Sequence, residues 1–260
     1  MDLRMRFDED TANYDRWRPR YSQQLFADLI RYASPDARSH AVEIGIGTGQ
    51  ATEPVLATGC RVTAIELGEK LAAYVAAKYR GQPKFEVRNI AFESFECPGE
   101  SIDLVYSATA FHWIPDETGY PAVYRMLRPG GTVALFWNRP GPSEKDAALH
   151  AKMQDLYAKH AEGFTRASEP EEDDIRYRRI RDTLARFGFV QIECHIYHAE
   201  RSFQADEYIA LLNTYSDHRS RPPEKKAAFE SDLRDLILAY GDRIRICDTM
   251  DLHLARKPLP

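Results

Sequence analysis

Short apolar runs alternate with helical patterns through the first half of the chain. They cover residues 41–45, 61–66, 84–88, 102–106 and 132–137. Short strands of almost continuous apolar character are typical of a parallel sheet that is covered on both faces. Between two of these runs, Leu71, Val75 and Tyr79 recur at helical spacing, and Gly81 follows as a helix stop. The pattern predicts an α/β fold with helices on both faces of a parallel sheet.

The rhythm changes after Asn138, where long helical patterns precede and separate two strand-like segments. Helical patterns cover 144–161, 174–187, 204–212 and 224–240, and strand-like alternation covers 188–197 and 243–256. We expect the last strand to return to the sheet. This organisation predicts a helical N-terminal lid (1–36), a ligand-binding core (37–140), helical cap insertions (141–187 and 203–242) and terminal strands (188–202 and 243–260).

Composition and charge exclude several classes of protein. The chain has 260 residues, 43% hydrophobic and 29% charged, which is ordinary for a globular protein. No apolar stretch approaches the ~20 residues that span a bilayer, and the start lacks a secretory signal, so we expect a cytoplasmic protein without membrane contact. A net charge of -5 argues against nucleic acid as the main partner. The four cysteines lie far apart, which predicts reduced thiols and no metal site.

A glycine-rich turn lies where the first strand meets the first helix, with the sequence Glu43-x-Gly45-x-Gly47-x-Gly49. In open α/β sheets this junction is the mouth of the ligand crevice. Gln50 stands where a dinucleotide-binding turn has its third glycine, so the spacing differs from that motif. Glu66 ends the second strand about 20 residues on, where a carboxylate can accept hydrogen bonds from both ribose hydroxyls. Together these features predict an adenosine-containing ligand.

Two further segments complete the pattern: Ser107 to Trp113 after the fourth strand, and Leu127 to Gly131 before the fifth. With these four features the chain resembles the class I S-adenosylmethionine-dependent methyltransferases, in particular the small-molecule, type 11 group that includes trans-aconitate and related acid methyltransferases. The resemblance implies a Rossmann-like, mostly parallel seven-stranded sheet with an antiparallel last strand and helical insertions that form a cap. It also implies S-adenosylmethionine as the methyl donor, with S-adenosylhomocysteine as product.

The resemblance assigns cofactor-binding positions across the first half of the chain. They are Tyr14, Arg18, Glu43, Gly45, Gly47, Thr48, Gly49, Gln50, Glu66, Leu67, Asn89, Ala91, Phe92, Ser107 and Ala108. Asn89 stands where relatives carry an Asp toward the adenine amino group. For this reason the backbone of Ala91 and Phe92 is the safer expectation for the adenine contact.

Five residues are candidates for contact with the methyl acceptor. An unperturbed imidazole titrates near 6.5, so His112 is a candidate base for an acidic hydroxyl or carbon. The alternative is that His112 only hydrogen-bonds the crevice wall. Tyr21 in the N-terminal segment, Trp113, and Tyr215 and His218 in the inserted region are candidate substrate contacts.

The sequence therefore predicts methyl transfer from S-adenosylmethionine to an oxygen or carbon of a small organic acceptor, by a monomer or homodimer. Two alternatives remain open. A nicotinamide-dependent oxidoreductase shares the glycine turn and the ribose carboxylate, although the glycine spacing and the lack of a second mononucleotide-binding half oppose it. A non-catalytic binding protein of the same fold is the other, because a fold alone does not guarantee activity.

Overall fold

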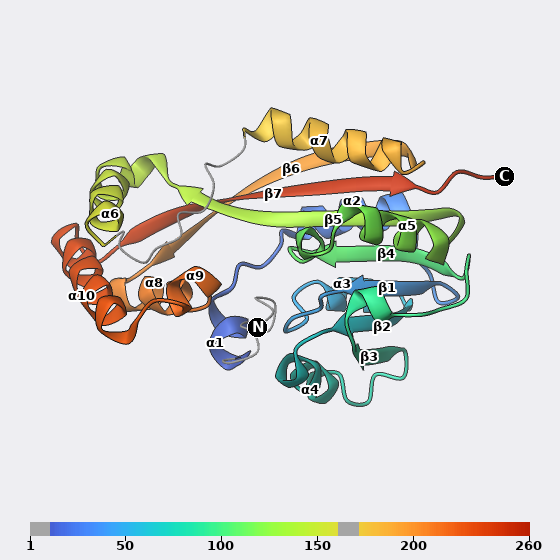
Figure 1. The fold of residues 1–260 in the computed structure, drawn as a ribbon, viewed down its shortest axis with the longest axis horizontal. Helices are drawn as coiled ribbons and strands as arrows, with labels where there is room; N and C mark the ends of the chain where they lie inside the picture. The colour runs from blue at the N-terminus through green and yellow to red at the C-terminus, as the bar shows by residue number, and fades with distance from the viewer. Residues whose placement is uncertain (1–10, 161–171) are drawn as a thin grey trace. The chain divides into compact units, whose positions relative to one another are not determined.

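The computed structural model describes residues 11–160 and 172–260 (Figure 1). Its helices are α1 (Thr11–Trp17), α2 (Gln23–Ala33), α3 (Thr52–Leu56), α4 (Glu69–Lys78), α5 (Asp116–Met126), α6 (Ala147–Lys159), α7 (Asp173–Arg186), α8 (Ala205–Leu212), α9 (Ser216–Arg219) and α10 (Pro223–Ala239). Its strands are β1 (His40–Ile44), β2 (Arg61–Glu66), β3 (Phe85–Asn89), β4 (Ile102–Ala108), β5 (Leu127–Pro142), β6 (Val190–Phe203) and β7 (Ile244–Arg256). Short 3-10 helices are η2 (Phe92–Ser94), η3 (Phe111–Trp113) and η4 (Glu144–Asp146).

The strands form one seven-stranded sheet in the order β3-β2-β1-β4-β5-β7-β6. Strands β3, β2, β1, β4 and β5 pair in parallel, and Glu43 of β1 lies in register with Ala64 of β2 and Tyr106 of β4. The arrowheads of β5 and β7 point in opposite directions in Figure 1. The predicted Rossmann-like, mostly parallel seven-stranded sheet with an antiparallel last strand is confirmed. Its carboxyl ends meet at one edge, which is where α/β folds bind ligands.

The chain divides into two compact units, each with its own core. Unit 2 comprises residues 20–138, 171–197 and 250–260, and unit 1 comprises 1–19, 139–170 and 198–249. The divisions after Asn138, Tyr197 and Thr249 fall inside β5, β6 and β7. The lid, core and cap boundaries inferred from the sequence stay predictions.

In unit 2, alternate residues of each strand face opposite layers of helices. Val42 of β1 and Val105 of β4 belong to a core cluster with residues of α5 and α7. Their neighbours Ala41 and Leu104 belong to a second cluster, formed with residues of α2 and α3. Because both faces are covered, the central strands are almost wholly apolar, as the sequence pattern predicted.

Unit 1 has a smaller core made mainly of helices. Residues of α6, α8 and α10 pack together, with Phe229, Leu233 and Ile237 of α10 almost fully buried. Trp17 of α1 packs against this cluster, and its ring lies 6.3 Å from that of Phe203.

Strand β5 is longer than the sequence pattern predicted. The apolar run covers residues 132–137, whereas the strand extends from Leu127 to Pro142. Proline removes a backbone donor but has a φ compatible with extended structure. The residues on either side of the run, which include proline and glycine, therefore prolong the strand without adding an apolar signal.

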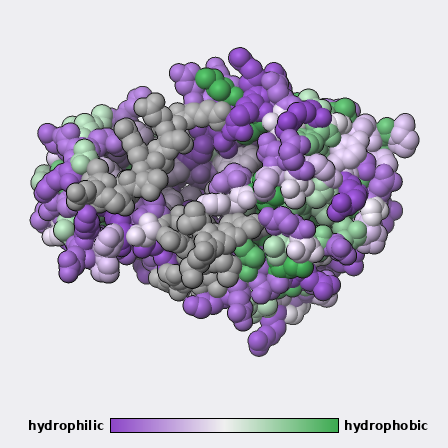
Figure 2. Space-filling model, in the orientation of Figure 1, coloured by the Kyte–Doolittle hydropathy of each residue, from purple (hydrophilic) through white to green (hydrophobic). Residues whose placement is uncertain are grey.

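The face in Figure 2 is dominated by hydrophilic residues, with apolar residues in small separate groups. Large contiguous apolar patches mark macromolecular docking sites, and this face carries none among the described residues. Across residues 11–160 and 172–260, no helix has the length and apolar character that crossing a membrane requires.

Candidate functional site

The turn between β1 and α3 needs glycine at three positions. Gly45, Gly47 and Gly49 have φ of +70°, +58° and +80°, a region that side chains rarely adopt. A Cβ on Gly45 would overlap the Cβ of Ala110, and one on Gly49 would lie 2.8 Å from the Tyr79 hydroxyl. The predicted glycines thus allow a tight turn with close backbone approach.

Glu66 holds this turn in place from the end of β2. Its carboxylate accepts the backbone N–H of Gly47 at 2.9 Å through one oxygen and the N–H of Gly68 at 2.8 Å through the other. The Glu66 residue is 8% exposed. Each oxygen of a carboxylate has two lone pairs, so a carboxylate at this position can accept more than one hydrogen bond through each oxygen.

Three buried polar atoms around the turn have no hydrogen-bond partner within the described protein: Glu43 Oε1, Thr48 Oγ1 and Gln50 Nε2. Buried polar atoms are normally satisfied, so such a cluster indicates a position for a ligand or water. The other Glu43 oxygen accepts the hydroxyls of Thr52 at 2.7 Å and Tyr106 at 2.8 Å. Burial raises the pKa of Glu43 to about 7, because a charge there loses its hydration.

Asn89 has a local role at the end of β3. Its side-chain amide donates to the carbonyl oxygens of Glu66 at 2.9 Å and Leu67 at 3.0 Å. It therefore links the end of β3 to the residues that follow β2. Ala91 precedes η2, and the Phe92 side chain is buried.

The end of β4 is tied to its neighbours by hydroxyl groups. The Ser107 hydroxyl donates to the Ile44 carbonyl at 2.9 Å. Ala108, half-buried, ends the strand, and Thr109 follows with φ of +53°. The Thr109 hydroxyl lies 2.7 Å from the Tyr21 hydroxyl. Tyr21 is thereby anchored beside the carboxyl end of the sheet.

Asn138 was missed by the sequence interpretation. It is 7% exposed, and neither atom of its side-chain amide has a hydrogen-bond partner within the described protein. Its backbone N–H donates to the Thr109 hydroxyl at 3.1 Å, which places it at the carboxyl end of the sheet. The available signal was its position directly after the apolar run of β5.

His112 lies in η3, with the adjacent Trp113 ring 5.2 Å away and 36% of Trp113 exposed. The Trp137 indole N–H donates to His112 Nδ1 at 3.1 Å. Part of His112 faces solvent, but burial of the ring and the positive charge of Arg176 lower its pKa to about 4. The imidazole is neutral at physiological pH.

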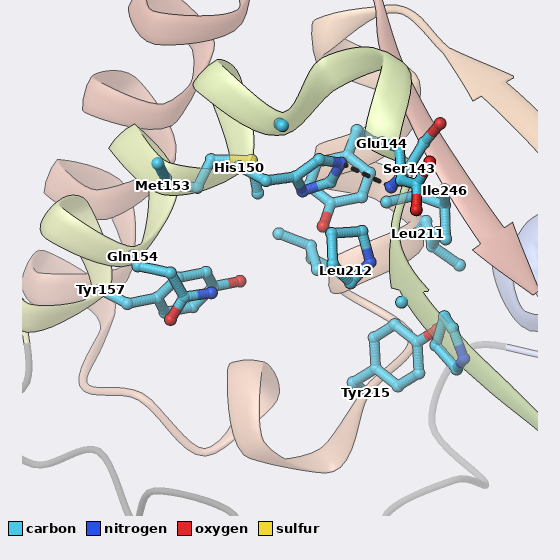
Figure 3. A pocket seen from close by; sticks show the side chains of 16 residues that line it. Ser143, Glu144, His150, Met153, Gln154, Tyr157, Leu211, Leu212, Tyr215 and Ile246 are labelled. Carbon is cyan, nitrogen blue, oxygen red and sulfur yellow. Dashed lines mark hydrogen bonds between the residues drawn. The ribbon is translucent and has the colours of Figure 1, made fainter. Parts of the chain in front are cut away.

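Unit 1 contains a cavity of about 540 Å³ between α6, α8 and the end of β5 (Figure 3). Its walls are mostly apolar or aromatic, with one charged side chain among the lining residues, Glu144. Tyr215 lines the cavity directly. His218 does not line it, but its Nε2 lies 3.2 Å from the hydroxyl of Tyr157, which does.

The two N-terminal cofactor candidates lie in unit 1. The Arg18 guanidinium donates to the Thr214 carbonyl at 2.7 Å and lies 4.4 Å above the Tyr215 ring. The structure thus places Arg18 beside a cavity-lining side chain. Tyr14 belongs to α1, but its side chain lies outside the described residues.

Comparisons with known proteins match this geometry. Residues 42–135 match the family model of a methyltransferase domain. An uncharacterised methyltransferase of Schizosaccharomyces pombe is 24% identical over 257 residues, covering 95% of this chain and 93% of that protein. The chain thus carries a methyltransferase domain, and its similarity is to S-adenosylmethionine-dependent methyltransferases. This decides against the oxidoreductase alternative.

Two further comparisons extend the family relation. The trans-aconitate 2-methyltransferase of Variovorax paradoxus is 28% identical to this methyltransferase over 147 residues, 56% of this chain and 53% of that protein. A protein of Anaeromyxobacter dehalogenans, described as a type II methyltransferase, has the same fold, with a TM-score of 0.66 and 22% identity. That alignment covers 94% of this chain and 99% of the other.

S-adenosylmethionine is the cofactor of this methyltransferase. The glycine turn fits it, since Gly45 and Gly49 have no room for a Cβ, and three buried polar atoms in and beside the turn have no hydrogen-bond partner within the described protein. Among the described residues, no group of three or more His, Cys, Asp or Glu side chains is placed to hold a metal ion.

Proposed function

We propose that this methyltransferase transfers a methyl group from S-adenosylmethionine to an oxygen or carbon of a small organic acceptor. The unpartnered polar atoms in and beside the glycine turn carry the proposal. The backbone of Gly45 to Gly49 would hold the homocysteine part, with Glu43 Oε1 toward its ammonium group. Glu66 would accept the ribose hydroxyls, and the backbone of Ala91 and Phe92 would meet the adenine.

When bound, the cofactor supplies an electrophilic methyl group on a sulfonium, and an acceptor lone pair forms the new bond while the carbon–sulfur electrons pass to sulfur. The protein contributes alignment and the exclusion of water, so no protein nucleophile is needed. Tyr21 and Asn138, both at the carboxyl end of the sheet, are candidate groups for orienting the acceptor.

The cavity of unit 1 supports a small-molecule acceptor with a substantial apolar body. Its volume of about 540 Å³ lies within the range of small-molecule sites. Met153, Leu211, Leu212 and Ile246 line it, with Tyr215 among its aromatic side chains. We propose Tyr215 as a direct acceptor contact and His218 as support for the wall through Tyr157.

The relative from Variovorax paradoxus is named for a carboxylic acid acceptor, trans-aconitate. Glu144 is the one carboxylate among the lining residues, and none of the described lysines or arginines lines the cavity to pair with a highly charged acid of that type. Burial of several unpaired anionic groups is costly. We therefore favour acceptors with at most one ionised group over polyacids.

Turnover with isotope-labelled S-adenosylmethionine tests the proposal. Aromatic acids, aliphatic acids, phenols, polyacids and amines are incubated with the enzyme, and the formation of S-adenosylhomocysteine and labelled product is measured by mass spectrometry. We expect product from an oxygen or carbon acceptor with an apolar body. Transfer to amines alone, or to no acceptor in the panel, would contradict the proposal. The Glu66→Ala variant is the control for cofactor-independent signal.

The remaining expectations are proposals of the same kind. The net charge of -5 supports a protein that does not work on nucleic acid. A cytoplasmic location and a monomeric or homodimeric state stay predictions, which size-exclusion chromatography with light scattering tests for the oligomer.

A further inference from the structure

The hydrogen bond between Trp137 and His112 defines where the His112 proton lies. An indole N–H can only donate, so the Nδ1 atom that receives it at 3.1 Å must carry a lone pair. In a neutral imidazole the single proton then belongs to Nε2. His112 therefore presents an N–H donor from Nε2, and its basic lone pair is already used by Trp137.

Trp137 is itself held by a charged side chain from α7. The Arg176 guanidinium lies 4.9 Å from the centre of the Trp137 ring, and Trp137 is 7% exposed. Such a contact between a guanidinium and an aromatic face is attractive. The ring of His253 lies 5.9 Å from Trp137 in an edge-to-face arrangement. The orientation of the indole is thus fixed from α7 and β7 together.

Arg176 is anchored by a carboxylate in the core. Its Nε lies 3.4 Å from Asp251 Oδ2, and the Asp251 side chain is fully buried. His253 Nε2 lies 2.9 Å from the same oxygen. The Arg176 side chain is only 16% exposed, although it belongs to a helix rich in charged residues. The chain of contacts runs from Asp251 through Arg176 and Trp137 to His112.

The charges around His112 act in the same direction as this hydrogen bond. Arg176 from α7 is the charged group that acts on it, and it opposes a second positive charge on the imidazole. Asp251 of β7 contacts Arg176, and His253 of the same strand contacts Asp251. Protonation would also break the bond from Trp137. Both effects favour the neutral ring.

We propose that Arg176 and Trp137 are positioning residues that keep His112 neutral with its proton on Nε2, so that His112 donates a hydrogen bond during methyl transfer and does not act as a base. This inference rests on the proposed methyl transfer and on His112 as a candidate acceptor contact. It argues against the base role, which is one of the two roles that the sequence leaves open for His112.

The proton balance of the reaction then limits the acceptor. With no base at His112, the acceptor oxygen must have lost its proton before it binds. Its lone pair forms the bond to the methyl carbon, and no proton has to leave in the same step. A carboxylate or another oxyanion that is stable at neutral pH meets this condition, and the Nε2–H of His112 is a suitable partner for it. Alcohols, which need a base, do not.

Nitrogen NMR of histidine-labelled protein tests the tautomer without any ligand. We expect wild-type His112 to show the Nε2–H form and no titration between pH 5.5 and 8. In Trp137→Phe the donor to Nδ1 is lost, so the His112 pKa should rise by about one unit or the Nδ1–H form should appear. Trp113→Phe, the same change at the adjacent tryptophan, should leave the tautomer unchanged. A wild-type His112 that titrates above pH 6, or that carries its proton on Nδ1, would overturn the proposal.

Kinetics separate a donor from a base. The side-chain amide of His112→Gln can donate a hydrogen bond but cannot take a proton at neutral pH. We expect His112→Gln to keep a kcat at least 10-fold above that of His112→Ala with an ionised acceptor. Equal loss in both variants, together with a wild-type rate that falls below a pKa near 6.5, would indicate a base instead. Binding of S-adenosylhomocysteine, measured on the same variants, shows separately whether the proposed function itself fails.

Discussion

Removal of the buried charge at Glu43 should stabilise the protein at high pH and much less at low pH. The pKa of Glu43 is raised from 4.5 to about 7 by burial, and both carboxylate hydrogen bonds, from Thr52 and Tyr106, are on one oxygen. Between these pH values the folded protein binds a proton that the unfolded chain releases, so the free energy of unfolding falls as pH rises. At 1.36 kcal/mol per pKa unit, the full effect is about 3 kcal/mol.

Glu43→Gln keeps an oxygen acceptor for Thr52 and Tyr106 but cannot ionise. Urea unfolding of wild type and variant at pH 5 and pH 8 measures the effect. The gain of the variant over wild type should be about 2 to 3 kcal/mol larger at pH 8 than at pH 5. Any cost of the new amide N–H group is independent of pH and cancels in this difference.

Glu53→Gln is the matched control, because Glu53 lies on α3 next to Thr52 and is exposed. Its stability difference from wild type should be the same at both pH values. If Glu43→Gln behaves in the same way as this control, Glu43 is ionised at no cost in the folded protein, and the argument from burial fails.

Three further predictions concern the turn, the ribose carboxylate and the cavity. Gly49→Ala places a Cβ 2.8 Å from the Tyr79 hydroxyl at φ +80°, whereas its control Gly81→Ala has φ +88° and open space around the new Cβ. Thermal unfolding should show a larger drop in melting temperature for Gly49→Ala than for Gly81→Ala. Titration calorimetry should show a weaker affinity for S-adenosylhomocysteine in Gly49→Ala alone. Glu66→Gln should weaken S-adenosylhomocysteine by about 1 to 3 kcal/mol in titration calorimetry, the cost of unpaired polar groups, and unchanged affinity would refute the ribose role. Tyr215→Ala should raise the KM for the acceptor several-fold with no change in S-adenosylhomocysteine affinity, and the reverse pattern would exclude Tyr215 from the acceptor site.

Sequence was sufficient for the features that depend on local spacing. The glycine turn and Glu66 were placed at the ends of β1 and β2 from the sequence alone, and the alternation of apolar runs with helices predicted that the strands are parallel. The predicted extent of β5 was too short, because the residues on either side of the apolar run at 132–137 include proline and glycine and add no apolar signal, although they belong to the strand.

Contacts between distant segments were beyond the sequence pattern. Trp137 is 25 residues from His112, and nothing in either segment indicates that the indole would take the imidazole lone pair. Similarly, charge spacing alone cannot tell which arginine of α7 turns inward, so the pairing of Arg176 with Asp251 was missed. Both are set by the packing of α7 and β7 on the sheet, which local periodicity does not encode.

A crystal structure of the protein with S-adenosylhomocysteine tests the central claim most directly. We predict that the homocysteine part lies against the backbone of Gly45 to Gly49 and that both ribose hydroxyls bind the Glu66 carboxylate. A nucleoside bound elsewhere, or a ribose turned away from Glu66, would contradict this account.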